Sequence, residues 1–117
     1  MNETGTTFHQ PDLVRIFGNP GRGLVDRIVS ALRQTLPVEE IWLFGSCARG
    51  NAGRDSDLDL LVVLADDHGL ARPTLACYRA IRKLHTGIPV DVMAISCSRW
   101  ERVRRPEVDP IKPRGRP

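Results

Sequence analysis

Residues 45–64 read GSCARGNAGRDSDLDLLVVL, and this stretch decides how the chain folds. Its second half, Leu58–Leu64, is apolar on both faces, which predicts a buried central strand. Two acids, Asp57 and Asp59, stand at the start of that strand, where charge costs free energy unless something pairs with it. Alternation along a strand puts both carboxylates on one face, with their Cα atoms roughly 7 Å apart. We expect the pair at an edge of the sheet, open to solvent.

Outward from this strand, the hydrophobic pattern predicts alternating helices and strands. Leu24, Ile28 and Leu32 recur at four-residue spacing before Pro37, which indicates a helix. The other expected elements are a strand over 41–44, a helical turn over 46–50, a loop over 51–55, a helix over 71–86, a strand over 90–95 and a helix over 98–105 with Ser98 as its N-cap. Residues 12–17 fit either a helical turn or a strand. This order predicts an α/β (α+β) fold in which helices pack against a short mixed β-sheet.

Composition divides the chain into three segments and excludes some function classes. Residues 1–19 lack a sustained period, 20–105 form the expected domain, and the Pro- and Arg-rich residues 106–117 are expected to be extended. Residues 99–117 hold seven basic and three acidic residues, so the net charge of +3 belongs to this tail. A uniformly basic nucleic-acid-binding face is therefore not indicated, and direct nucleic-acid contact is not expected.

The same composition indicates a cytoplasmic protein. No apolar run approaches the roughly 20 residues of a membrane span, and the N-terminus has no signal-peptide pattern. Three cysteines occur without a CxxC pair, which favours reduced thiols. We expect no membrane partner.

Three acids and a glycine-serine pair suggest a metal and phosphate site. Asp57 and Asp59 would repel each other, and a divalent cation between them removes the repulsion. Asp91 is a single charge in the apolar strand 90–95, and it can face the pair if that strand lies beside Leu58–Leu64. All-oxygen ligands suit Mg²⁺, and Asp91 would also serve as the general base for an attacking hydroxyl. Gly45 ends a strand and permits close backbone approach, and Ser46 opens a helical turn whose free N–H groups bind phosphate.

The stretch GSCARGNAGRDSDLDLLVV, followed by a helix and PVDV, resembles the signature of the DNA polymerase β-type nucleotidyltransferases, and most closely the minimal nucleotidyltransferase (MNT) domains. The resemblance covers about residues 24–103. It implies that Asp57, Asp59 and Asp91 bind two Mg²⁺ ions. It also implies that Gly45 and Ser46 bind the phosphates of a nucleotide substrate, expected to be ATP.

Small size within that superfamily suggests a more specific role. The chain is similar to the antitoxins of HEPN–MNT toxin–antitoxin pairs, which implies transfer of AMP from ATP to a tyrosine hydroxyl of a HEPN ribonuclease toxin, and a hetero-oligomer with that toxin. Two alternatives stay open: an antitoxin that acts mainly by binding, and a nucleotidyltransferase acting on a small molecule such as an aminoglycoside.

Other polar and aromatic residues have competing interpretations. Arg49 either contacts the nucleotide or braces the loop through an acid such as Asp55, and Ser56 either contacts the nucleotide or caps the loop. Tyr78 is expected in the core, on a helix stripe with Leu75, Ile81, Leu84 and His85.

Overall fold

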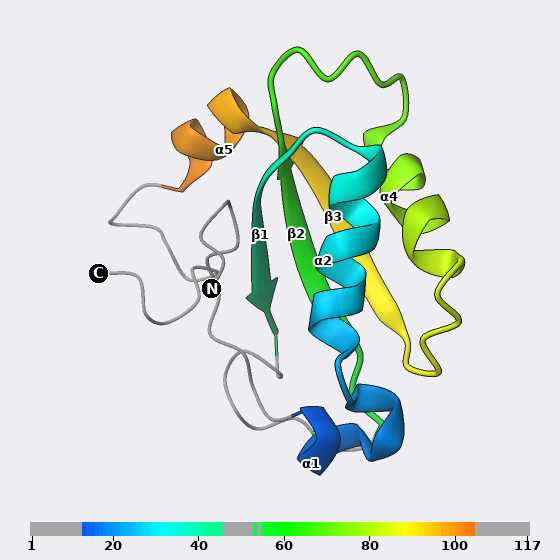
Figure 1. The fold of residues 1–117 in the computed structure, drawn as a ribbon. Coiled ribbons are helices and arrows are strands. Elements are labelled where there is room, and N and C mark those ends of the chain that lie inside the picture. Colours follow the sequence, from blue (N-terminus) through cyan, green and yellow to red (C-terminus); the bar gives the residue numbers. More distant parts are fainter. Residues whose placement is uncertain (1–12, 46–52, 54, 105–117) are drawn as a thin grey trace.

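The described part of the chain forms a three-stranded mixed sheet with two long helices on one face (Figure 1). A short helix follows the end of the third strand. The computed structural model describes residues 13–45, 53 and 55–104. Within them the elements are α1 (Leu13–Phe17), η1 (Asn19–Gly21), α2 (Leu24–Thr35), β1 (Val38–Phe44), β2 (Leu58–Leu64), α4 (Pro73–Arg82), β3 (Val90–Ser96) and α5 (Cys97–Val103). The predicted α+β architecture is confirmed. No described helix has both the length and the apolar character that crossing a membrane requires.

Strand β2 is the centre of the sheet. It pairs antiparallel with β1 and parallel with β3, in the order β1-β2-β3. Its bounds match the predicted strand, and every residue of it is buried except Asp59, which is half-buried. The acids therefore lie at the end of the central strand, whereas the sequence had placed them at an edge of the sheet.

Alternation in β2 divides the interior into two hydrophobic clusters. Leu60 and Val62 point toward α2 and α4 and join the larger cluster. Leu61 and Val63 point to the opposite face and join a smaller cluster with two tryptophans, Trp42 of β1 and Trp100 of α5. Their ring centroids lie 5.6 Å apart.

Arg104 completes the smaller cluster. Its guanidinium lies 5.4 Å from the centre of the Trp42 ring and 5.5 Å from that of Trp100, which are cation–π distances. The same group lies 3.9 Å from the Glu40 carboxylate, which also accepts a hydrogen bond from the Trp42 indole at 2.8 Å. The face of the sheet that α2 and α4 leave uncovered is thus closed at one end by α5.

Helix α4 is shorter than the predicted helix 71–86 and turns a different side to the core. It ends at Arg82, and His85 takes a left-handed backbone conformation with φ 51°, which a helix cannot continue through. His85 is therefore exposed beyond the helix, where a helical position on the stripe was predicted. The buried side is formed by Cys77, Ala80 and Ile81, whose small first two members let the helix approach the sheet closely.

The predicted burial of Leu75 and Tyr78 is wrong, since each is 37% exposed. The Tyr78 hydroxyl instead accepts a hydrogen bond from the Val92 N–H of β3 at 3.1 Å, and the Thr74 hydroxyl accepts one from the Ala94 N–H at 3.1 Å. These side chains, one turn apart on α4, tie the helix to the outer edge of β3.

Of two terminal details, one agrees with an alternative that the sequence left open and the other differs from the prediction. The segment 12–17, left open between helix and strand, forms helix α1 over Leu13–Phe17. Helix α5 begins at Cys97, so Ser98 lies inside it rather than at its N-cap. The Ser98 N–H donates a hydrogen bond to the Asp66 carboxylate at 2.8 Å, so an acid from another loop satisfies this first-turn donor. The predicted turn over 46–50 and the tail 106–117 lie outside the described residues.

Candidate active site

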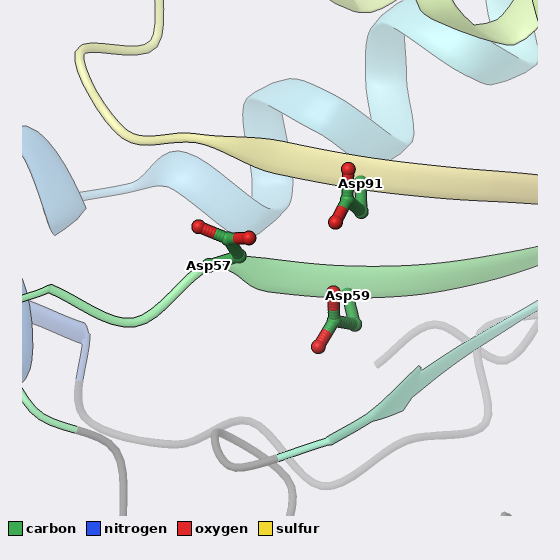
Figure 2. Close-up of side chains that lie close together, drawn as sticks. All are labelled: Asp57, Asp59 and Asp91. Carbon is green, nitrogen blue, oxygen red and sulfur yellow. The ribbon is translucent and has the colours of Figure 1, made fainter.

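Three aspartates meet at the end of the sheet where β2 and β3 begin (Figure 2). The parallel pairing sets Asp59 directly beside Asp91, and Asp57 immediately precedes β2. Each carboxylate offers one oxygen atom, and these three atoms lie within 4.8 Å of one another. The predicted encounter of Asp91 with the Asp57–Asp59 pair is confirmed. The acids occupy the face of the sheet opposite α2 and α4.

The charges in this triad repel one another. Burial raises the pKa of Asp59 above its ordinary value, and the negative charges of Asp91 and then Asp57 raise it further. Asp57 and Asp91 are exposed, so solvent screens them more than it screens Asp59. The folded chain therefore holds together three carboxylates whose mutual repulsion a bound cation would relieve.

Gly45 borders the triad on the β1 side. Phe44 pairs with Asp59 across the β1–β2 ladder, so the next residue passes directly by that carboxylate. Gly45 has φ 79°, in the left-handed region that favours glycine, and a Cβ atom built there would collide with the Asp59 carboxylate. The glycine thus makes room for a metal-site residue, while its predicted contact with phosphate stays a prediction.

The other predicted nucleotide-binding residues divide into two groups. Ser46 and Arg49 lie outside the described residues. Ser56 closes the loop before Asp57: its hydroxyl accepts a hydrogen bond from the Gly53 N–H at 2.9 Å, and its N–H donates to the Gly53 carbonyl at 3.0 Å. This contact fits the loop-cap interpretation, and a nucleotide contact of Ser56 stays a prediction.

Tyr78 is a site residue that the sequence interpretation missed. Its hydroxyl donates a hydrogen bond to Asp91 Oδ1 at 3.3 Å while it accepts one from the Val92 N–H. The signal that could have found it is the hydroxyl group, because a buried tyrosine hydroxyl needs a hydrogen-bond partner. Here β3 supplies the partners. Tyr78 therefore borders the triad on the β3 side, as Gly45 does on the β1 side.

The triad fits a hard divalent cation. Its donor set consists of carboxylate oxygens alone, which is the ligand type that Mg²⁺ prefers. A cation held there would oppose the effects that raise the pKa of Asp59, because it favours the charged form. Asp57, Asp59 and Asp91 are the residues that would hold it.

The chain is similar to known proteins in sequence and in fold. Residues 25–112 match the family model described as a nucleotidyltransferase domain. The structure is similar to the crystal structure of a presumed nucleotidyltransferase from Sulfolobus solfataricus, with 26% sequence identity and a TM-score of 0.54, over 75% of this chain and 83% of the other. Among curated proteins, no match was found.

Proposed function

Because the chain belongs to the nucleotidyltransferase domain family, we propose that it transfers AMP from ATP to a tyrosine hydroxyl of a HEPN ribonuclease toxin and so acts as the cytoplasmic antitoxin. The observation that carries this proposal is the meeting of Asp57, Asp59 and Asp91 at one end of the sheet. A nucleotidyl transfer needs such a cluster, since the transferred and leaving phosphates bring negative charge that must be neutralised. The resemblance to MNT antitoxins supports the choice of acceptor.

The residues of the triad would divide the work. Asp57 and Asp59 would hold two Mg²⁺ ions together with Asp91, and bound Mg²⁺ supplies neutralisation of the phosphate charge. The acceptor oxygen forms a bond to the α-phosphorus of ATP as the bond to pyrophosphate breaks. Asp91 takes the proton of the acceptor hydroxyl. The hydrogen bond from Tyr78 to Oδ1 of Asp91 would orient this carboxylate for that role.

The proposal is tested by a transfer assay with α-labelled ATP, Mg²⁺ and the co-encoded HEPN protein. The test variant is Asp57→Ala, and its matched control is Asp67→Ala, which removes an exposed acid from the turn after β2. We expect label on the toxin with the wild type and the control, and at least a hundredfold less with Asp57→Ala, in line with the roughly 10²–10³-fold effect of losing one group that stabilises transition-state charge.

Each other result contradicts a definite part of the proposal. Wild-type labelling by Asp57→Ala would show that the triad is not the active site. Toxin inhibition without any label would show an antitoxin that acts by binding. Label on an aminoglycoside, with none on protein, would move the acceptor to a small molecule.

A further inference from the structure

A pocket of about 540 Å³ is lined by α4, the turn after it and the start of β3. Its apolar part is formed by Leu75, Ile81 and Val90, together with the ring of Tyr78. The volume falls within the roughly 300–1,000 Å³ of pockets that bind ligands. None of the site residues predicted from the sequence lines it, so the triad alone does not account for it.

The rim of this pocket is basic. Arg79 and Arg82 stand three residues apart on the last turns of α4, and His85 follows in its left-handed conformation. No acidic side chain is among the described residues that line the pocket. Two guanidinium groups on one side of a helix repel each other, and an anion bound between them removes that repulsion. The pocket therefore matches an anionic group attached to an apolar body.

Tyr78 connects the pocket to the triad, because its ring lines the pocket while its hydroxyl bonds Asp91. Gly45 lies on the other side of the triad, next to Asp59 and β1. The strand order β1-β2-β3 thus separates the predicted phosphate side from the pocket side. In a phosphoryl-type transfer the attacking and leaving oxygens lie roughly in line on opposite sides of the phosphorus. The pocket therefore lies on the Asp91 side of the triad, beside α4 and the outer edge of β3, and an acceptor held in it has to reach Asp91 around that edge.

We propose that this pocket binds an acidic segment of the acceptor protein and so presents a nearby hydroxyl to Asp91. The inference rests on the proposed function for the existence of a protein acceptor. Arg79 and Arg82 would bind a carboxylate, and the apolar floor would take the neighbouring side chain. A nucleic acid fits less well, since its backbone requires an extended basic stripe, whereas residues 1–98 hold ten basic and eleven acidic residues.

The probe is a fluorescent random copolymer of glutamate and tyrosine, with a lysine–tyrosine copolymer as its opposite-charge counterpart. Binding is measured by anisotropy without nucleotide, for the wild type, Arg79→Glu, Arg82→Glu and the control Arg99→Glu. Arg99 is also an exposed helical arginine, but it follows the C-terminal end of β3, roughly 20 Å from the pocket end of that strand. We expect each pocket variant to weaken binding of the acidic copolymer about tenfold or more, as loss of a charge-assisted bond predicts. Arg99→Glu should stay near wild type, and the lysine copolymer should not bind.

Equal binding by all variants, or an equal loss with Arg99→Glu, would overturn the pocket assignment. Tighter binding of a single-stranded RNA of the same charge through Arg79 and Arg82 would assign the pocket to nucleic acid instead.

Asp57→Ala separates this inference from the proposed function, because it should keep copolymer binding while transfer is lost. Pocket-dependent binding by a wild type that labels no acceptor would refute the proposed function alone. Toxin labelling that is indifferent to both arginines would refute the pocket alone.

Discussion

At the scale of single residues, Asp59 is where stability and function conflict. It is the half-buried member of three neighbouring carboxylates, and burial followed by the charges of Asp91 and Asp57 raises its pKa above the ordinary 3.8. The folded protein therefore binds a proton at Asp59 more tightly than the unfolded chain does. By linkage, the contribution of Asp59 to the free energy of unfolding is fully present below the ordinary pKa and is lost as the pH rises through the raised pKa.

Asp59→Asn should consequently raise the melting temperature of the metal-free protein at neutral pH, because it removes the charge that folding disfavours. The gain should shrink as the pH is lowered through the raised pKa of Asp59, because below it the wild-type carboxyl is itself protonated in the fold. Calorimetry across this range checks both statements, with Asp67→Asn as the control for an exposed acid.

Added Mg²⁺ should raise the melting temperature of the wild type and have a much smaller effect on Asp59→Asn. If metal-free Asp59→Asn were less stable than the metal-free wild type at neutral pH, the repulsion would not be the dominant effect at Asp59.

Gly45 offers a second prediction at the same scale. Gly45→Ala introduces both a left-handed alanine and a collision with the Asp59 carboxylate. Gly69→Ala is the matched control: Gly69 has φ 71°, but its added Cβ would meet just one atom, at 3.9 Å. Both should lose about 1–2 kcal/mol of stability from the left-handed alanine. Only Gly45→Ala should lose Mg²⁺ binding and transfer, measured by calorimetric titration and by the label assay. If Gly45→Ala keeps both as well as Gly69→Ala does, the collision is relieved.

At the scale of elements, α4 acts on the site through its contact with β3. Thr74 and Tyr78 accept hydrogen bonds from successive outward N–H groups of the strand. Of these two hydroxyls, that of Tyr78 also donates a hydrogen bond to the Asp91 carboxylate. The helix thereby fixes the position of Asp91 relative to Asp59.

Tyr78→Phe should therefore lower kcat several-fold with a smaller change in KM, because Asp91 loses its orienting hydrogen bond while the ring stays in place. Thr74→Val is the control, since it removes the equivalent bond two residues further along β3. Steady-state transfer kinetics give kcat and KM for both variants. If Thr74→Val lowers kcat equally, the tyrosine acts by holding the strand and not by orienting Asp91.

At the scale of the whole molecule, one strand serves both hydrophobic clusters. Alternate residues of β2 belong to the large cluster under α2 and α4 and to the tryptophan cluster under α5. Neither cluster can lose β2 without disturbing the other, so the described part of the chain is expected to unfold as one unit.

Urea unfolding should accordingly give one midpoint by two probes. The chain has two tryptophans, both in the smaller cluster, so fluorescence reports on the α5 side. Far-UV circular dichroism reports mainly on α2 and α4. Coincident curves are expected, and a fluorescence transition at lower urea would show that α5 detaches independently.

The sequence predicts the three strands and the meeting of the three acids because the strand signals are local, although β1 begins at Val38 and not at the predicted residue 41. Leu58–Leu64 is apolar at nearly every position, and the helix that follows it permits the parallel pairing that brings Asp91 to Asp59. The end of α4 and the orientation of Tyr78 are different, since both depend on tertiary contacts. The small residues Cys77 and Ala80 decide which side of the helix meets the sheet. The stripe of larger residues in the sequence had predicted that another side of the helix is buried.

The hydroxyl groups of Thr74 and Tyr78 also decide how this sheet meets other chains. An exposed outer strand usually offers free N–H groups that another polypeptide can pair with, which is a common origin of aggregation and of recognition by strand addition. Here the donors of Val92 and Ala94 are already engaged from the side by α4. Strand addition at this part of β3 is thereby disfavoured, and removing both hydroxyls should free these two donors to pair with another chain.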